Sequence, residues 1–373
     1  MVSRKTTVIS INASWNIVNF RLGLVRALQQ AGHRVVAIAP RDEHSAQLEA
    51  LGIEYRPIAM DRKGLSPLRD LRLLARYWLI LREVRPDVFL GYTAKPNVYG
   101  SLAAHALGIK VINNVSGLGT AFIREGLLQR IVSALYRLAF RRSATVFFQN
   151  EEDRDLFVAK GIAAPDKARL LPGSGIDIER FRPAEAAPGG GGFTFLLVAR
   201  LLRDKGVREY VEAARRLRRE GSEARFQLLG FLDPGNRSAI AREELEGWVA
   251  EGIIDYLGQS DDVRPFIAAA DCVVLPSYRE GLPRTLLEAA AMGKPLIATD
   301  VPGCRHLVEH GVNGLLCAVR DADSLADAMS TMLRSTPERR SEWGGAGRRR
   351  IELEFDEKIV ARRYLEAIAE ASP

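Results

Sequence analysis

Two carboxylates set eight positions apart are the first residues of the sequence that could do chemistry. Glu280 precedes a Gly-Leu-Pro turn, and Glu288 lies in TLLEAAAMG, a segment expected to be helical up to Gly293. The turn at 281–283 would open that helix, where free backbone N–H groups favour an anion. Carboxylates accept hydrogen bonds from sugar hydroxyls and do not bind phosphate, so the combination favours a ligand with both phosphate and carbohydrate parts. Capping of the helix by Glu280 explains the spacing equally well.

Two cations precede a second expected helix. Arg200 directly follows the apolar strand FTFLLVA, and Lys205 and Gly206 come just before the helix at about 206–219. Cations at the carboxyl end of a strand that face a helix N-terminus make a phosphate site. Each charge-assisted hydrogen bond there contributes roughly 1.5–3 kcal/mol. Ordinary surface cations also meet the R-x4-K spacing and are the simpler explanation for an isolated pair.

Strand-like and helix-like segments alternate around these residues. Apolar runs such as RVVAIAP and DVFLGY, separated by segments such as 19–31 with apolar residues at helical spacing, predict parallel sheets covered by helices on both faces. The stretch PGGGG at 188–192 predicts the domain boundary. We therefore expect an α/β protein with two Rossmann-like, doubly wound domains at 1–187 and 188–355, followed by a C-terminal helix in 356–373. Ligands of such folds bind outside the carboxyl ends of the strands, so a cleft between the two domains is expected.

The composition limits the partner and the compartment. The net charge is +7 and the pI about 9.4, which suits nucleotide phosphates, nucleic acid or an anionic membrane face. Nucleic acid is the least favoured, because the sequence has no RRM, KH or zinc-finger pattern. The widely spaced Cys272, Cys304 and Cys317 form no CxxC pair, so a reducing compartment fits best. The sequence shows no signal peptide and no membrane-spanning apolar run, which predicts a soluble or peripherally attached protein.

Two basic amphipathic segments, 66–85 and 127–142, bear on a membrane role. Covering of the sheet by their apolar sides is the simpler explanation, because a doubly wound domain needs such helices. Their arginines could in addition meet an anionic inner leaflet, at roughly 1 kcal/mol per cation near the surface. The first segment contains Leu68, Leu71, Leu74, Trp78 and Leu81 with Arg69, Arg72, Arg76 and Arg82, and the second contains Leu128, Ile131, Leu135 and Leu138 with Arg130, Arg137, Arg141 and Arg142.

Longer motifs carry a resemblance to a known family. In order, VARLLRDKG, YLGQSDDV, LPSYREGLPRTLLEAAAMGKPLIATDVPG and HGVNGLL resemble the donor domain of family 4 retaining glycosyltransferases, which have the GT-B fold. SWNIVNFRLGLVRAL, VSGLGTAF and VFFQNEEDRDLF are similar to the branch of bacterial N-acetylhexosaminyltransferases that act on undecaprenyl-diphosphate-linked glycans. The resemblance implies transfer of a sugar, of the N-acetylhexosamine class, from a UDP-sugar to a lipid-diphosphate-linked saccharide. It places the protein in the cytoplasm, peripheral on the inner face of the plasma membrane, in surface-glycan or protein-glycan assembly.

The resemblance also assigns roles on the donor side. Arg200 and Lys205 would neutralise the donor diphosphate and help UDP to leave. Glu280, with the backbone at 281–283, would face the donor sugar, and Glu288 would accept hydrogen bonds from the ribose hydroxyls. The expected catalytic residues are Arg200, Lys205 and Glu280, and the expected donor-binding residues are Gly258, Ser277, Gly281, Leu282, Pro283 and Glu288, with the loop 258–263 bordering the base.

The implied reaction retains the anomeric configuration, and no carboxylate is convincingly placed as a covalent nucleophile. We expect front-face transfer, in which the leaving phosphate oxygen takes the proton of the acceptor. No DxD-type cluster stands at a fitting strand end, and Asp261 and Asp262 are better explained as a cap, so neither a metal nor another cofactor is expected. Ser174–Asp177 resembles the interdomain turn of the family, and the last helix would cross back to the first domain.

Loops of the first domain should line the acceptor. Asn16, Asn19 and Arg21 open the first helix, Ser116, Gly117 and Gly119 follow the fourth strand, and Lys95 follows the third. Lys95 could hold an acceptor phosphate, although a surface lysine is the simpler explanation. Many relatives carry a histidine near the position of Ser116, whereas the nearby His105 is better explained as part of a covering helix. His306 stands where an acid is frequent in the family, and we have no functional account of that change.

Two other functions stay open at this point. A sugar-nucleotide epimerase shares the architecture but needs no acceptor, so incubation with UDP-N-acetylglucosamine alone would reveal it. A catalytically silent sugar-nucleotide sensor would lose the diphosphate cations, whereas Arg200 and Lys205 are both present.

Overall fold

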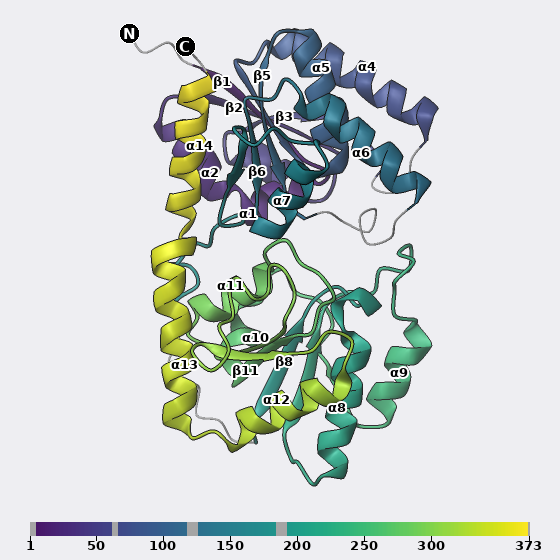
Figure 1. Ribbon diagram of the computed structural model, residues 1–373, viewed down its shortest axis with the longest axis vertical. Coiled ribbons are helices and arrows are strands. Elements are labelled where there is room, and N and C mark those ends of the chain that lie inside the picture. The colour runs from purple at the N-terminus through teal and green to yellow at the C-terminus, as the bar shows by residue number, and fades with distance from the viewer. Residues whose placement is uncertain (1–4, 62–65, 118–125, 184–191, 372–373) are drawn as a thin grey trace. The chain divides into compact units, whose positions relative to one another are not determined.

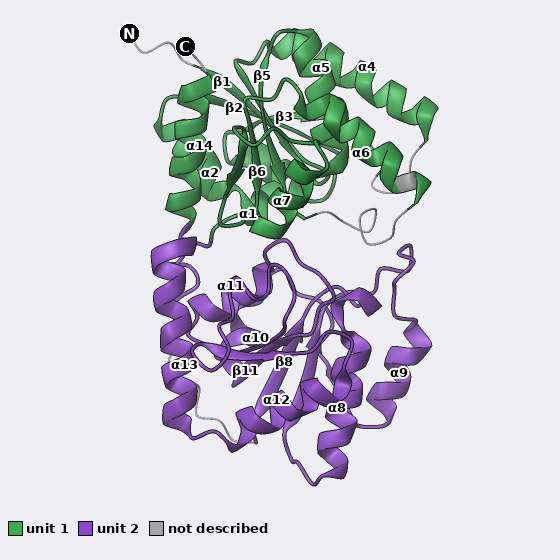
Figure 2. Cartoon of the chain, in the orientation of Figure 1, with its two compact units in different colours: residues 1–175, 357–373 green, residues 176–356 purple. Residues whose placement is uncertain are grey.

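The chain forms two compact α/β units. The computed structural model describes residues 5–61, 66–117, 126–183 and 192–371. The first unit comprises residues 1–175 and 357–373, and the second comprises residues 176–356 (Figure 2). The division falls within the segment that resembles the interdomain turn, not at 187/188. The glycine stretch does not mark the boundary, because residues that precede it, such as Ile176 and Phe181, are already buried in the core of the second unit.

The first unit is built on a seven-stranded parallel sheet with the order β3-β2-β1-β4-β5-β6-β7. The order reverses between β1 and β4, which makes this the switch point where ligands of such sheets bind. Its strands are β1 (Thr6–Ser10), β2 (Arg34–Ala39), β3 (Glu54–Pro57), β4 (Val88–Tyr92), β5 (Lys110–Val115), β6 (Thr145–Phe148) and β7 (Ala168–Leu170).

Helices cover both faces of this sheet (Figure 1). They are α1 (Ser14–Phe20), α2 (Leu22–Gln30), α3 (Ser45–Ala50), α4 (Pro67–Val84), α5 (Ser101–Ala106), α6 (Leu127–Phe140), α7 (Glu151–Ala159) and α14 (Glu357–Ala371), with a π-helical turn at Pro96–Gly100. The C-terminal α14 lies beside α2 and buries Val360 and Tyr364 in the same core (Figure 1). The single helix expected at 19–31 is wrong, because the backbone leaves the helical region at Arg21, with φ −131°, and starts again as α2.

The second unit repeats the plan with a six-stranded parallel sheet, order β10-β9-β8-β11-β12-β13. Its strands are β8 (Thr194–Val198), β9 (Arg225–Leu229), β10 (Asp255–Tyr256), β11 (Cys272–Leu275), β12 (Leu296–Thr299) and β13 (Gly314–Cys317). Its helices are α8 (Val207–Arg219), α9 (Arg242–Ala250), α10 (Arg264–Ala269), α11 (Arg284–Ala291), α12 (Ala322–Arg334) and α13 (Pro337–Arg350), with a short 3-10 turn at Arg203–Lys205 and a π-helical turn at Ile351–Phe355. The predicted doubly wound α/β class is confirmed for both units.

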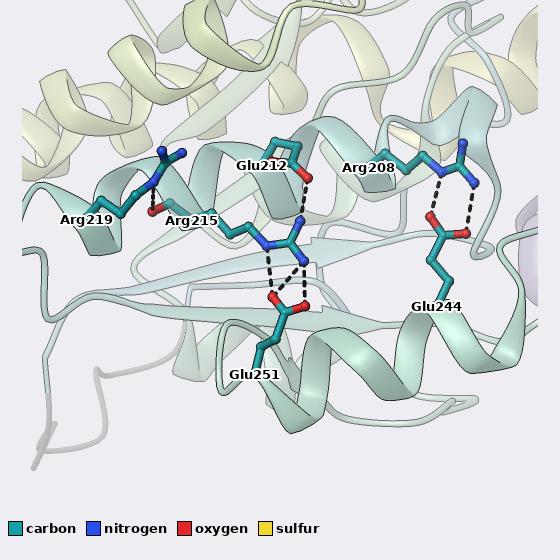
Figure 3. Close-up of polar contacts among 6 residues, drawn as sticks. All are labelled: Arg208, Glu212, Arg215, Arg219, Glu244 and Glu251. Carbon is teal, nitrogen blue, oxygen red and sulfur yellow. Dashed lines mark hydrogen bonds and ion pairs between the residues drawn. The ribbon is translucent and has the colours of Figure 1, made fainter.

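Part of the arginine excess is neutralised on the surface of the second unit. Arg208 on α8 forms a two-pronged ion pair with Glu244 on α9, and Arg215 bonds to Glu251 and Glu212 (Figure 3). Such exposed pairs contribute about 0–1 kcal/mol each. These arginines therefore have a structural explanation and need no anionic ligand.

Two further properties bear on the environment of the protein. No helix among the described residues is long and apolar enough to cross a membrane. Cys272, Cys304 and Cys317 are free and buried, and burial raises the pKa of each thiol, that of Cys317 to about 12. These thiols serve as small apolar core residues.

Candidate active site

Two loops meet at the switch point of the second sheet. β8 is flanked by β9 and by β11, so the loop after β8 (199–206) and the loop after β11 (276–283) open at neighbouring carboxyl ends. The N–H of Tyr278 donates to the carbonyl oxygen of Asp204 at 2.9 Å. Gly206, with φ +71°, packs so closely on the carbonyl of Pro276 that a Cβ there would collide with it. The two loops are thus joined as one wall.

An ion pair links two of the three predicted catalytic residues on this wall. Lys205 Nζ lies 2.5 Å from Glu280 Oε1, and Ser277 Oγ donates to the same oxygen at 2.7 Å. The side chains of Lys205 and Glu280 are only 22% and 13% exposed. The capping interpretation of Glu280 is wrong, because α11 begins at Arg284 without a side-chain cap and the Glu280 carboxylate faces Lys205 instead. The wall therefore offers a cation and a carboxylate in direct contact.

A third loop supports the turn at Gly281. Gly303, with φ +84°, packs against the carbonyl oxygens of Glu280 and Gly281, where a Cβ would collide. Its N–H donates to Nδ1 of His306 at 3.3 Å, which gives His306 a structural role in holding this loop. Thr299 Oγ1 donates to the carbonyl of Ser277. Sequence reasoning missed Thr299 and Gly303, although a glycine in VPG after an apolar strand is a signal for such a turn.

Glu288 forms a separate, buried carboxylate site on α11. Arg284 Nε lies 2.9 Å from Glu288 Oε1, and the two side chains are 18% and 10% exposed. Burial raises the pKa of Glu288, while the charges of Arg284 and Arg180 act to lower it and that of Asp262 to raise it.

The 258–263 loop is fixed at both ends. The carbonyl of Gly258 accepts the N–H of Gly230 at 2.7 Å, and Gly230 packs directly on the carbonyl of Ala199, after β8. Asp262 accepts the backbone N–H of Arg264, the first residue of α10, at 3.1 Å. The cap expected of Asp262 is not formed as such, because Val263 is the N-cap residue of α10 and α10 has no side-chain cap, but the Asp262 carboxylate still holds the first residue of the helix. The loop lies at the same edge of the sheet as the wall.

Arg200 stands apart from the ion pair. Its guanidinium lies 3.6 Å from Asp233 Oδ2, and its side chain is 48% exposed. Among the residues with described geometry, the structure thus joins Lys205, Ser277 and Glu280, whereas Arg200 and Glu288 have other partners. Leu282 and Pro283 continue the wall into α11, with Pro283 as its N-cap residue.

Two of the predicted acceptor residues of the first unit, Arg21 and Ser116, lie near the carboxyl ends of β4 and β5. The guanidinium of Arg21 lies 4.6 Å from the ring centre of Tyr92 and is buried, and within the described chain its Nε has no hydrogen-bond partner. Ser116 Oγ donates to Asn114 Oδ1 at 2.8 Å, and Asn114 Nδ2 donates to the Tyr364 hydroxyl at 2.9 Å. Arg21 and Ser116 are therefore brought to one region.

The other acceptor-side predictions have different outcomes. Asn16 and Asn19 lie on α1 and bond locally, Asn16 to Asn12 and Asn19 to the carbonyl of Trp15. Gly117 has φ +125° directly after β5, and Gly119 lies outside the described residues.

The surface-lysine interpretation of Lys95 is wrong. Its Nζ lies 2.7 Å from Asp70 Oδ1 on α4, and the two side chains are only 13% and 6% exposed. His105 lies on the covering helix α5, as expected, with Nε2 2.9 Å from the carbonyl oxygen of Ala139, and burial lowers its pKa.

Comparisons with known proteins agree with this architecture. Residues 17–173 match the family model described as glycosyl transferase 4-like domain, and residues 192–335 match glycosyl transferases group 1. The chain is 29% identical over 370 residues to the N,N'-diacetylbacillosaminyl-diphospho-undecaprenol alpha-1,3-N-acetylgalactosaminyltransferase of Campylobacter jejuni, covering 95% of this chain and 96% of that one. It is 30% identical over 380 residues to the glycogen synthase of Mycobacterium tuberculosis, covering 91% and 87%.

Solved structures show the same fold. The crystal structure of Anabaena Alr3699/HepE in complex with UDP and glucose superposes with a TM-score of 0.82 at 19% identity, covering 98% of this chain and all of that one. Sucrose-phosphate synthase from Thermosynechococcus elongatus superposes with a TM-score of 0.81 at 19% identity, covering 98% and 99%. The chain belongs to the GT-B glycosyltransferases that join a glycosyl transferase 4-like domain to a group 1 glycosyl transferase domain.

Proposed function

We propose that this glycosyltransferase moves an N-acetylhexosamine from a UDP-sugar to a lipid-diphosphate-linked saccharide in the assembly of a bacterial surface or protein-linked glycan. The observation that carries the proposal is the Lys205–Glu280 pair at the switch point of the second sheet. The acceptor class is supported by the Campylobacter relative, which is named for an undecaprenyl-diphosphate substrate and aligns over almost the full length. An epimerase or a silent sensor is not favoured, because the relatives described above are named as sugar-transferring enzymes.

The ion pair suits a ligand with a diphosphate next to a sugar. An ammonium group has three donors, so Lys205 can turn toward the donor diphosphate, whose charge competes with that of Glu280. Glu280, still held by Ser277 at 2.7 Å, then accepts a hydrogen bond from a sugar hydroxyl. The two charges thus exchange partners when the substrate binds.

Glu288 suits the ribose. A cis-diol offers two donors, and an ionised carboxylate accepts both. Burial opposes ionisation of Glu288, and Arg284 at 2.9 Å favours it. Arg284 is therefore the positioning residue that keeps Glu288 able to accept hydrogen bonds.

In the proposed front-face reaction, the bond between the anomeric carbon and the UDP oxygen breaks while the acceptor oxygen bonds to the same face. The acceptor proton passes to the leaving phosphate oxygen. Arg200 and Lys205 stabilise the charge that develops on UDP, so catalysis rests on positioning and electrostatics. We propose that no divalent metal is needed, because these cations supply the positive charge, and we expect turnover to persist in EDTA.

We further propose that the first unit rests on the anionic inner face of the membrane. On α4, Tyr77 and Leu81 cover the sheet, whereas Leu68 and Leu71 are 73% and 64% exposed. The apolar side chains of this segment thus cover the sheet only in part, because these two leucines are exposed. Exposed Leu79, at 60%, extends the same face, and arginines beside it would add about 1 kcal/mol each near anionic lipid.

The test is UDP release by the purified protein with a panel of UDP-sugars, with and without a lipid-diphosphate-linked saccharide. We expect release that requires the lipid-linked acceptor, and an α-linked product from an α-linked donor by NMR. Conversion of UDP-N-acetylglucosamine without acceptor would instead identify an epimerase. Tight UDP binding without turnover on any acceptor would identify a sensor.

A further inference from the structure

A basic pocket lies in the first unit between α4 and the segments that follow β2 and β3. It has a volume of about 590 Å³, and we name it the α4 pocket. Pro40 and Arg41 line it directly after β2, Ile58–Asp61 after β3, and Lys95 after β4. The pocket therefore opens at the carboxyl ends of the strands, the edge where sheets of this type bind ligands.

Cations outnumber acids around this pocket. Its charged lining consists of Arg41, Arg69, Arg72, Arg76 and Lys95 with only Asp61 and Asp70. Asp70 pairs with Lys95 at 2.7 Å, and Asp61 pairs with Arg69 at 3.1 Å. Within the described part of the chain, Arg41 and Arg72 have no carboxylate partner, and Arg76 donates to the carbonyl of Ala59 at 3.2 Å. Both acids are thus already engaged, and an excess of positive charge faces the pocket.

This arrangement differs from the surface arginines of the second unit. On α8, Arg208 and Arg215 meet the carboxylates of Glu244 and Glu251, in α9 and directly after it (Figure 3). Arginines that gather without acids repel each other, and an anion that accepts hydrogen bonds from several of them relieves this repulsion. The α4 pocket is therefore the stronger anion site of the two arginine-rich regions.

The floor of the pocket is preorganised. Lys95 and Asp70 are almost buried, and the second oxygen of Asp70 accepts the N–H of Ser66 at 3.2 Å. The described residues take one hydrogen bond from the Lys95 ammonium, at Asp70, so its remaining donors are available to a ligand. A buried ammonium beside exposed guanidinium groups fits a compact oxyanion with several acceptor oxygens, such as a phosphate ester.

The same helix offers an apolar surface to the rest of such a ligand. Leu68, Leu71 and Leu79 are exposed on α4. Phosphate-binding and apolar surfaces on one helix match an amphiphile whose charged head and hydrocarbon chain lie side by side.

We propose that the α4 pocket binds the phosphate ester of a membrane lipid while the exposed leucines of α4 lie against its hydrocarbon. The lipid source rests on the proposed function, whereas the binding of a phosphate ester follows from the pocket alone. Two sources share this chemistry, the diphosphate of the lipid-linked acceptor and the headgroup of an anionic phospholipid.

The matched pair Arg72→Gln and Arg26→Gln tests the proposal. Both arginines are exposed, on α4 and on α2, and both changes remove one charge, but only Arg72 lines the pocket. Binding of farnesyl diphosphate in vesicle-free buffer is measured by calorimetry. Binding to phosphatidylcholine vesicles, with and without phosphatidylglycerol, is measured by sedimentation. UDP affinity checks that the second unit is intact in each variant.

We expect Arg72→Gln to weaken binding about tenfold and Arg26→Gln less than about twofold. A selective loss for farnesyl diphosphate identifies the acceptor diphosphate as the source, and a selective loss only for phosphatidylglycerol vesicles identifies the phospholipid. Equal losses in the two variants, or no saturable binding of either probe, would overturn the proposal. If the pocket binds one of the two probes but the wild-type protein transfers no sugar to any lipid-linked acceptor, the proposed function is refuted. The proposal of a phosphate-ester site in the α4 pocket is then retained.

Discussion

The Lys205–Glu280 pair allows structure and catalysis to be separated by experiment. Lys205→Met removes the positive charge and nearly keeps the length of the side chain. Glu280 then loses its counter-charge but keeps the hydrogen bond from Ser277. The two side chains are 22% and 13% exposed, between the exposed and buried extremes, so the loss of unfolding free energy should be about 1–3 kcal/mol. The double variant Lys205→Met/Glu280→Gln should recover most of this loss, because no buried charge is left unpaired.

Turnover should respond differently from stability. Losing one charge-assisted contact of about 1.5–3 kcal/mol with the departing UDP lowers kcat/KM roughly 10- to 150-fold. Glu280→Gln cannot restore that contact, so the double variant should be as stable as the wild type and yet remain slow. Urea unfolding gives the stability, and continuous UDP release gives the kinetics.

The surface pair Arg208–Glu244 is the matched control in the same unit (Figure 3). Arg208→Met should cost at most about 1 kcal/mol and leave kcat/KM unchanged, since exposed ion pairs contribute little. Recovery of turnover together with stability in the Lys205→Met/Glu280→Gln variant would refute the reasoning, because the pair would then be only structural.

Three further expectations follow from single contacts. Burial raises the pKa of Glu288, so this carboxylate takes up a proton at a higher pH than an ordinary carboxyl group. Because the protonated form accepts fewer hydrogen bonds, UDP affinity should already fall at that pH. Glu288→Gln should abolish this pH dependence in calorimetry. Gly303→Ala should destabilise more than Gly311→Ala, since both have positive φ but only Gly303 meets backbone carbonyls; equal urea midpoints would contradict this. Asp70→Asn should cost about 3–5 kcal/mol by leaving the Lys95 ammonium buried without its counter-charge, and the additional change Lys95→Met should recover much of it.

The fold and the position of the donor-side cations could be predicted from the sequence because they depend on local patterns. Apolar runs mark strands buried on both faces. Arg200 and Lys205 stand directly after such a run, so their place at the carboxyl edge follows from the direction of the chain. The broken helix at Arg21 was not predictable from periodicity, because the apolar spacing continues across the residue whose φ is −131°.

Contacts between distant segments could not be predicted in the same way. Nothing local indicates that Lys205 meets Glu280, since the pair depends on the close approach of Gly206 to Pro276. Lys95 is a similar case, because its burial depends on Asp70, which a different helix supplies. Both pairs lie where a loop after one strand meets an element from elsewhere in the chain, which a one-dimensional pattern does not encode.

The net charge of the protein illustrates why composition alone was ambiguous. On α8, Arg208 and Arg215 are compensated by Glu244 and Glu251, in α9 and directly after it, whereas on α4 the arginines outnumber the acids around one pocket. The wall at the switch point has a third arrangement, in which Lys205 is paired with the carboxylate of Glu280; in the proposed function, the donor diphosphate displaces this carboxylate. A compensated arginine stabilises the fold, an uncompensated one favours binding of an anion, and an exchangeable pair lets a charged substrate enter without leaving a buried charge alone. The distribution of acids around the cations, more than their number, therefore separates structural charge from functional charge in this chain.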